Sequence, residues 1–295
     1  MVNSPRTTNH HLLAFLQKHF SRVCYPIQKF FAAAEYWLLD CWWALRGHRK
    51  PSPGEVALVA GKVTFMFKSF ERQKQAIALV KSIRRFFPGT RIVIADDSKE
   101  PLQIAGDDVT IIHMPFNSGL SKGLNLALAE IKTPFLFRMD DDELLIRRTN
   151  LAKELQFFEL HPEVDLVGIP CIDACKPSSV KKNLKVYSKF PMRDAPLPLK
   201  IAHGAWIDSF HVVFGKVPNI FIAKTEAVRQ VGWDDNIRMI DHHDFFYRAA
   251  GVIVSVISRR SVVFHNHNYF SKEYNSYRSD WKGDAIYLRQ FRYKR

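Results

Sequence analysis

The segment at residues 135–143 decides the fold: it reads Phe-Leu-Phe-Arg-Met followed by Asp-Asp-Asp-Glu. Its apolar half predicts a buried β-strand, and the carboxylates follow at the end of that strand. Adjacent carboxylates repel one another unless a cation neutralises them. A hard divalent cation accepts such oxygen ligands and keeps positions open for substrate phosphates. We therefore expect a metal site at Asp140, Asp141 and Asp142, although an isolated acidic triplet is also typical of a surface turn.

The chain before this segment alternates apolar, β-rich runs with amphipathic stretches. Strands are predicted at residues 63–67, 91–95 and 109–113. This alternation is typical of an α/β protein in which a mostly parallel sheet carries helices on its faces. Ligands of such sheets bind beyond the carboxyl ends of the strands. Asp96 and Asp97, which end the second strand, therefore share a predicted crevice with the acidic triplet.

A loop of small residues at 117–123 precedes a helix that is predicted to run to about residue 130. Ser118, Gly119 and Lys122 offer flexible backbone and a positive charge near the N-terminus of this helix, where N–H groups bind phosphate. Such a loop is not specific on its own. Combined with the acidic triplet, it predicts a metal-bridged anion, which is the usual arrangement for a nucleoside diphosphate leaving group.

A second charged cluster stands at the predicted start of a later helix. Its residues Asp241, His242 and Asp244 include carboxylates and an imidazole that can take the proton from an attacking hydroxyl. A helix-capping Asp beside solvated histidines is the alternative interpretation. Farther along, a short predicted strand at residues 262–264 ends in His265, which is either a metal ligand or a polar turn residue.

The first part of the chain differs in composition from the rest. Residues 1–50 carry seven Lys and Arg against two acidic residues, many aromatic side chains, and no apolar run long enough to span a bilayer. We predict a helical extension and linker over residues 1–54, with two helices separated near Pro26, followed by a globular domain at 55–295. Aromatic residues beside basic ones suit a helix in the headgroup region of a membrane; packing on the following domain is the alternative.

The formal charge of +14 is compatible with nucleic acid, an anionic membrane surface or an anionic substrate. Because no RNA-binding motif or recognition helix accompanies the basic residues, we expect no nucleic-acid partner. A basic run at residues 176–200 is either a solvated loop or a contact for an anionic acceptor. The sequence has no Asn-X-Ser/Thr glycosylation site and no visible membrane span. We therefore expect a membrane-associated protein on the cytoplasmic face, with a Golgi membrane as the alternative.

These motifs, in this order, resemble inverting GT-A glycosyltransferases of the family 2 kind, and most of all the β-1,4-N-acetylgalactosaminyltransferases. The resemblance covers roughly residues 62–268. It implies a GT-A fold with a nucleotide-binding half at about 62–143 and an acceptor half at about 144–270. It also implies transfer of a hexose or N-acetylhexosamine from a UDP-sugar to a hydroxyl of a glycan or glycolipid, with Mn²⁺ or Mg²⁺ as cofactor.

The resemblance assigns roles to single residues. The DXD motif of the family matches residues 140–142, which implies that Asp142 ligates the metal and that Asp140 lies near the ribose, with Asp141 also on the donor side. The late metal-binding histidine of the family matches His265. The base and ribose of the donor are implied to lie at Ser69, Glu71, Arg72, Asp96 and Asp97.

Two departures from the family pattern leave roles open. Leu124 stands where the family loop has an Arg, and Lys122 supplies a charge two residues earlier. His242 stands where related transferases place an Asp, so the catalytic base is open among Asp241, His242 and Asp244. Two other functions also remain open. One is a nucleotidyl- or phosphotransferase, which would not release UDP; the other is a non-catalytic glycan-binding or membrane-scaffold protein with the same fold.

Overall fold

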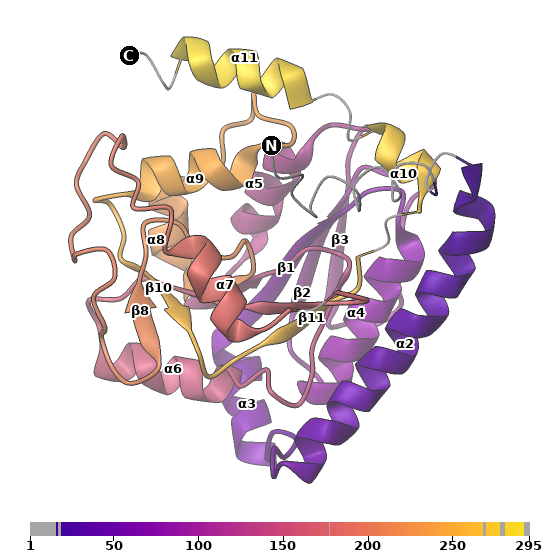
Figure 1. Cartoon of the computed structure of the whole chain (residues 1–295), viewed down its shortest axis with the longest axis horizontal. Helices are drawn as coiled ribbons and strands as arrows, with labels where there is room; N and C mark the ends of the chain where they lie inside the picture. Colours follow the sequence, from indigo (N-terminus) through magenta and orange to yellow (C-terminus); the bar gives the residue numbers. More distant parts are fainter. Residues whose placement is uncertain (1–15, 17–18, 177, 268–269, 278–280, 292–295) are drawn as a thin grey trace, which may run out of the picture.

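The computed structural model describes residues 16, 19–176, 178–267, 270–277 and 281–291. A large central sheet lies between layers of helices (Figure 1). Its strands are β1 Val63–Ser69, β2 Ile92–Asp96, β3 Val109–His113, β4 Phe135–Arg138, β6 Leu166–Gly168, β8 His211–Val213, β9 Phe221–Lys224 and β10 Ser255–Ser258. A second, three-stranded sheet contains β5 Glu143–Leu144, β7 Cys171–Asp173 and β11 Val263–His265.

The helices come from every part of the described chain. They are α2 Ser21–Leu45, α3 Pro53–Lys62, α4 Gln73–Phe86, α5 Leu120–Glu130, α6 Leu151–Leu160, α7 Val180–Tyr187, α8 Thr225–Val231, α9 Asp241–Ala249, α10 Lys272–Tyr277 and α11 Trp281–Phe291. Within the described residues, no helix combines the length and the apolar character that crossing a bilayer requires.

The strand order of the large sheet is β3-β2-β1-β4-β9-β6-β10-β8. Strands β3, β2, β1 and β4 run parallel, as do β6 and β10. Strand β9 is antiparallel to β4 and β6, and β8 is antiparallel to β10. The strands predicted from the first half of the sequence are thus found, and the antiparallel ones come from the second half. Because β1, β2 and β4 are parallel, the residues after them meet at one edge of the sheet.

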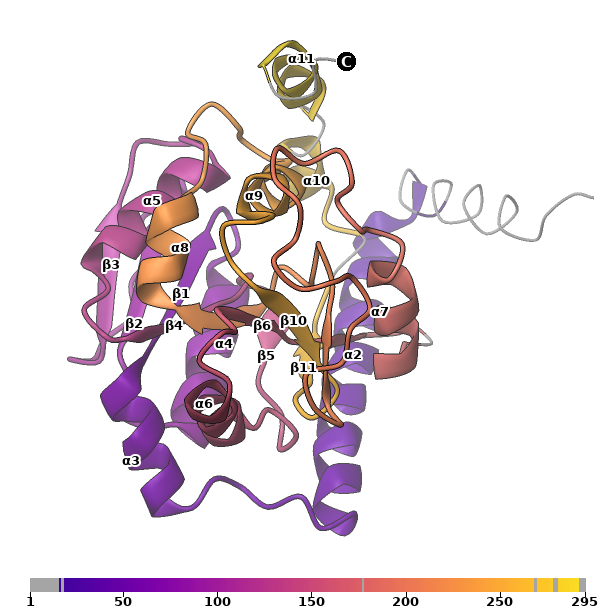
Figure 2. The same cartoon turned by 90° about the vertical axis from the view of Figure 1, so that its left-hand side faces the viewer.

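Both faces of the large sheet are covered because its strands are apolar on both sides. Along β1, Val63, Phe65 and Phe67 are buried in the core that includes α4, whereas Met66 is buried in the core that includes α5. Figure 2 shows α5, α8 and α9 on one side of the sheet and α3, α4 and α6 on the other. Burial of apolar surface on both faces fixes the strands, and hence the positions of the residues that follow them.

The N-terminal extension differs from the prediction in two ways. Helix α2 runs through Pro26 without a break, although proline removes one helix hydrogen bond. Contacts farther along α2, where Ala32 packs against the three-stranded sheet, outweigh that loss. The expected linker contains the start of α3: Ser52 and Glu55 form a reciprocal capping box, with Pro53 at the first helical position.

Candidate active site

A pocket of about 740 Å³ opens at the carboxyl ends of β1 and β4. This is the edge at which the sequence places the acidic triplet, and the volume suits a substrate-sized ligand. Segments far apart in the sequence contribute to its wall. The lining residues include Lys68, Phe70, Arg72, Asn117, Gly119, Asp140, Asp141, Asp142, Asp173, Lys176, Tyr187, Arg238, Asp241, His242, His265, His267 and Tyr274.

The guanidinium of Arg72 contacts two carboxylates of the acidic triplet. Its Nη1 donates to Oδ2 of Asp142 at 2.7 Å, and its Nη2 pairs with Asp141. The guanidinium also lies over the ring of Tyr274, 4.1 Å from the ring centroid. Burial raises the pKa of Asp141 to about 7. Burial acts in the same direction on Asp142, but Arg72 and His265 outweigh it and hold the pKa of that carboxyl well below its usual range.

Two histidines share the carboxylate of Asp142. Its Oδ2 lies 3.6 Å from Nε2 of His265 and 3.4 Å from Nδ1 of His267. One ligand atom of each of these three residues lies within 4.8 Å of the other two. Nδ1 of His265 is 2.7 Å from Oδ1 of Asp173, which leaves Nε2 toward Asp142. A carboxylate with two imidazoles is a set of ligands that can hold a divalent cation.

His267 is a site residue that the sequence analysis missed. The signal was present, because His265 and His267 are two residues apart, a spacing that places side chains of an extended segment on the same side. Asp173, which orients His265, gave no comparable signal. It belongs to β7, which pairs with β11 only in the folded chain.

Asp140 is the most exposed member of the triplet. Its Oδ1 lies 2.8 Å from Nη1 of Arg138, whose side chain is fully buried. Its backbone N–H donates to Oε2 of Glu143 at 2.9 Å. Burial, with the nearby Asp140 carboxylate, raises the pKa of Glu143 well above its usual range. Arg138 therefore balances the charge of Asp140, and Glu143 contributes a hydrogen-bonded acid beneath the turn.

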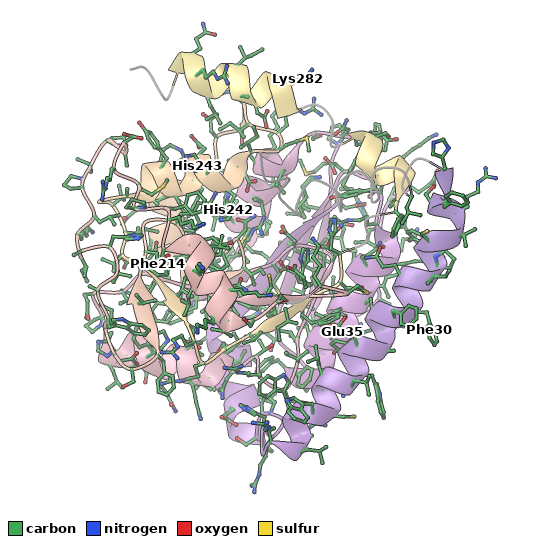
Figure 3. All side chains as sticks on the ribbon, viewed as in Figure 1. Phe30, Glu35, Phe214, His242, His243 and Lys282 are labelled. Atoms are coloured by element: carbon green, nitrogen blue, oxygen red, sulfur yellow. The ribbon has the colours of Figure 1, made fainter. Side chains whose placement is uncertain are left out.

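The first residues of α9 present Asp241 and His242 to the pocket; Figure 3 labels His242 on the side of α9 that faces the rest of the domain. Asp241 is buried, and its Oδ2 has no hydrogen-bond partner among the described residues. Burial raises the pKa of Asp241 to about 6. Nε2 of His242 donates to the carbonyl oxygen of Val217 at 2.8 Å. Burial and the charge of Lys216 lower the pKa of His242, so its imidazole is neutral.

Asp244, the third candidate base, does not line the pocket. It is buried, and its Oδ2 accepts a hydrogen bond from Nε of Arg248 at 2.7 Å. Nη2 of Arg248 donates to the carbonyl oxygen of Gly232 at 2.9 Å. This pair ties α9 to the end of α8. The structure therefore places Asp244 outside the pocket that Asp241 and His242 line. The sequence could not show this difference, because Asp244 is only three residues from Asp241.

The two carboxylates at the end of β2, Asp96 and Asp97, accept hydrogen bonds from neighbouring segments of the chain. Oδ2 of Asp96 accepts from the N–H of Leu102 at 2.7 Å. Asp97 accepts from Nζ of Lys68 at 2.5 Å and from the N–H of Gly119 at 3.1 Å. Of the predicted donor residues, Arg72, Gly119, Asp140 and Asp141 line the pocket, whereas Ser69, Glu71, Asp96, Asp97, Ser118 and Lys122 do not.

Lys122 does not supply the positive charge that the sequence analysis expected from it at the pocket. It is the third residue of α5, and its side chain is exposed. Among the residues that the structure describes, four other cationic ones line the pocket. They are Lys68, Arg72, Lys176 and Arg238. Of these, only Arg72 was a predicted donor residue, because the other three belong to no motif.

A buried carboxylate from the C-terminal helix holds the segment before α9. Asp284 of α11 accepts hydrogen bonds from the N–H groups of Arg238 at 3.0 Å, Met239 at 2.6 Å and Ile240 at 3.0 Å. Nη2 of Arg238 donates to the carbonyl oxygen of Asn117 at 2.5 Å. Asp284 thereby positions the start of α9 and the loop before α5. Its separation of 44 residues from Ile240 explains why the sequence gave no signal for it.

The sheet, with a pocket and an acidic cluster at the end of β4, has the GT-A fold. The crystal structure of residues 1–349 of S. aureus TarS shows the same fold, with a TM-score of 0.53 at 15% identity over 69% of this chain and 60% of that chain. Residues 67–210 match the family model described as glycosyl transferase family 2. This match spans just under half of the chain, and over that segment the chain is similar to this family.

Comparison with individual proteins shows a resemblance to one group of glycosyltransferases. The chain is 35% identical over 196 residues to beta-1,4 N-acetylgalactosaminyltransferase 1 of Rattus norvegicus. The matched segment covers 65% of this chain and 37% of that protein. It is 31% identical over 207 residues to beta-1,4 N-acetylgalactosaminyltransferase 2 of Mus musculus, covering 68% of this chain and 38% of that protein. The chain thus spans less than half the length of these relatives, and its resemblance to this group of transferases is confirmed.

Proposed function

We propose that the chain transfers a sugar from a UDP-sugar to a hydroxyl of a glycan or glycolipid, with inversion at the anomeric carbon. One observation carries the proposal: the carboxylate-imidazole cluster lines the same pocket as Asp241, a buried carboxylate whose Oδ2 has no hydrogen-bond partner among the described residues. The cluster suits a cation that binds a diphosphate, and the carboxylate suits a general base. Crystal structures of TarS contain UDP and UDP-GlcNAc, and we propose a donor of this class here.

The residues present fit a divalent cation held by Asp142, His265 and His267. A second possible grouping, Cys171 with Asp173 and His265, shares one histidine with the first. We assign Asp173 to the outer shell because it is hydrogen-bonded to Nδ1 of His265. Mg²⁺ prefers oxygen ligands, so two imidazoles disfavour it; of the two cations expected from the sequence, Mn²⁺ and Mg²⁺, we propose Mn²⁺. When bound, such an ion supplies positive charge to the diphosphate leaving group.

Asp241 is the proposed base. It accepts the proton of the acceptor hydroxyl while that oxygen forms a bond to the anomeric carbon. The bond between this carbon and the diphosphate oxygen breaks, and UDP leaves with the electron pair. A carboxyl with a pKa of about 6 is ionised at neutral pH and is more basic than an ordinary Asp. His242 is a poorer base because its lowered pKa disfavours the protonated form.

The cationic residues of the pocket stabilise the charge that develops on the leaving group. Lys68, Arg72 and Arg238 come from the side of the pocket near β1 and α5. Arg72 pairs with Asp141 and Asp142; in the donor complex we propose that it binds phosphate oxygens instead. Preorganised positive groups of this kind are worth several kcal/mol in the transition state, of order 3 kcal/mol for one donor.

The acceptor is proposed to bind on the side formed by β7 and α7. Tyr187, at the end of α7, and Lys176 line the pocket there. Both belong to or adjoin the basic run at residues 176–200. This positive charge suits an anionic acceptor, because opposite charge steers and retains such a ligand.

The test is UDP release by the purified chain from a panel of UDP-sugars, with Mn²⁺ and with EDTA, in the presence of candidate glycan acceptors. We expect release from one donor that requires the metal, and a product of inverted anomeric configuration by NMR. Pyrophosphate release in place of UDP would assign a nucleotidyltransferase. Neither release nor binding of any donor would contradict the proposal.

A further inference from the structure

Helix α2 is apolar on two opposite sides. One side packs against the three-stranded sheet through Ala32, Tyr36 and Trp43. The other side is in solvent and carries a row of large apolar residues at helical spacing. We call this row the α2 stripe; its members are Ile27, Phe30, Trp37, Leu38, Trp42 and Leu45, with 71% exposure at Phe30 and 86% at Leu45.

The two acidic residues of α2 are both bonded to the domain. Oε2 of Glu35 accepts from the N–H of Cys175 at 2.7 Å, and Asp40 is buried against Nη2 of Arg85 at 2.6 Å. Both acidic residues of the helix are thus used in contacts with the domain; Figure 3 shows Phe30 and Glu35 on opposite sides of α2. Exposed basic residues stand near both ends of the helix. They are Arg22, Arg46, Arg49 and Lys50.

We propose that the α2 stripe docks on the surface of a bilayer that contains anionic phospholipids, with the helix axis parallel to the membrane. In this position the apolar and Trp side chains enter the boundary between headgroups and acyl chains. The basic residues at the two ends contact lipid phosphates. Charge complementarity carries the choice of a lipid surface, because the members of the stripe are apolar and the exposed charges at its ends are basic. Glu35 lies in the groove beside the stripe, but its carboxylate is hydrogen-bonded to the N–H of Cys175.

A second copy of the chain fits this surface less well. In a symmetric dimer through the same stripe, the partner would present the same apolar row and the same basic ends. Neither acidic residue of α2 is available to pair with them, since Glu35 and Asp40 are already bonded to the domain. Like charges would therefore meet at or near the ends of the paired helices, which disfavours the contact.

The stripe lies beside the candidate active site. Cys175 lines the apolar groove along α2, and its neighbours Asp173 and Lys176 line the site pocket. Nε2 of Gln28, on the inner side of α2, donates to the carbonyl oxygen of His267 at 2.9 Å. Docking through α2 therefore brings the β7 side of the pocket close to the membrane.

The test is co-sedimentation of the full chain with vesicles of phosphatidylcholine alone and of phosphatidylcholine mixed with phosphatidylserine. We expect binding to the mixed vesicles that weakens as salt is raised. Leu38→Glu places a charge at the centre of the stripe, where Leu38 is 66% exposed, and lowers binding at least about tenfold. The matched control is Leu160→Glu, at a helical leucine on α6 that is 77% exposed, and it leaves binding unchanged.

Circular dichroism and thermal unfolding establish that both variants fold, as expected for substitutions at exposed positions. Equal vesicle binding by wild type and Leu38→Glu overturns the proposal, as does failure of the wild type to bind anionic vesicles. A wild-type dimer that Leu38→Glu dissociates, without vesicle binding, assigns the stripe to a contact between copies and overturns it as well. Vesicle binding requires no turnover, so the outcome is independent of the proposed transferase activity.

Discussion

Nη1 of Arg72 lies 2.7 Å from Oδ2 of Asp142, the same oxygen that faces the imidazoles of His265 and His267. In this arrangement the guanidinium neutralises the carboxylate that the proposed cation would also need. Two positive groups at one oxygen repel each other, so the Arg72 contact and cation binding oppose each other. Arg72 released from Asp142 remains beside the pocket, where its charge can serve the donor phosphates.

Replacing Arg72 should therefore separate metal binding from turnover. For Arg72→Met we expect Mn²⁺ affinity to rise by about tenfold, because a charge-assisted hydrogen bond that competes for Asp142 is lost. Turnover should fall, because the donor loses a cationic contact. Calorimetric titration with Mn²⁺ measures the affinity, with Arg84→Met as control because Arg84 pairs with the remote Asp108. Weaker Mn²⁺ binding by Arg72→Met would show that Arg72 supports the metal site instead.

Asp241→Asn removes the proposed base and keeps the size of the side chain. We expect kcat to fall at least about a hundredfold, as for loss of a general base, with Mn²⁺ binding retained. Asp244→Asn is the comparison, because Asp244 pairs with Arg248 away from the pocket. That variant should lose about 1–3 kcal/mol of unfolding free energy and little of kcat. Equal losses of kcat in the two variants would contradict the assignment.

The pKa of Asp241, raised by burial to about 6, predicts the acid limb of the pH profile. Below pH 6 the carboxyl is protonated and cannot accept a proton, so kcat/KM should rise with pH through 6 and level off above it. Steady-state UDP release across this range measures the profile. The limb should be absent from the residual activity of Asp241→Asn; a limb that persists there belongs to another group.

Asp284 positions the site through hydrogen bonds to the backbone before α9. Asp284→Ala leaves the N–H groups of Arg238, Met239 and Ile240 without their acceptor. We expect a kcat lower by about tenfold or more, since a small displacement of the start of α9 moves Asp241. Asp284→Asn keeps one acceptor oxygen and should restore part of the loss. Thermal unfolding and kcat are measured together: unchanged kcat in Asp284→Ala would remove the positioning role.

The parallel half of the fold followed from local sequence patterns. Strands β1 and β2 are mostly buried apolar runs, and β3 is a short β-branched run that is partly exposed. Their positions could therefore be predicted from the sequence alone. The three-residue strands β6 and β8 are too short to show a period, so their place in the sheet depended on pairing with distant strands. The predicted break at Pro26 was wrong for a similar reason, because the packing of α2 on the domain outweighs the local effect of the proline.

The site residues also divide into those that belong to local sequence motifs and those that only the fold brings to the site. Asp142, His265 and Asp241 stand in compact motifs at the ends of predicted elements, and the structure brings them to one pocket. Lys122 stands in such a motif too, but the direction in which its side chain leaves α5 is not visible in a loop pattern. Asp284 contributes through hydrogen bonds to backbone 44 residues away, a relationship that only the folded chain creates.

The most direct test of the proposed chemistry is Mn²⁺-dependent UDP release by wild type and by Asp142→Asn, each also assayed with EDTA. Asp107→Asn serves as the control because Asp107 is exposed and does not line the pocket. We predict that EDTA abolishes wild-type release and Mn²⁺ restores it, and that Asp142→Asn stays at least about a hundredfold below wild type in Mn²⁺. Full Mn²⁺-dependent release by Asp142→Asn would contradict the metal site and the mechanism built on it.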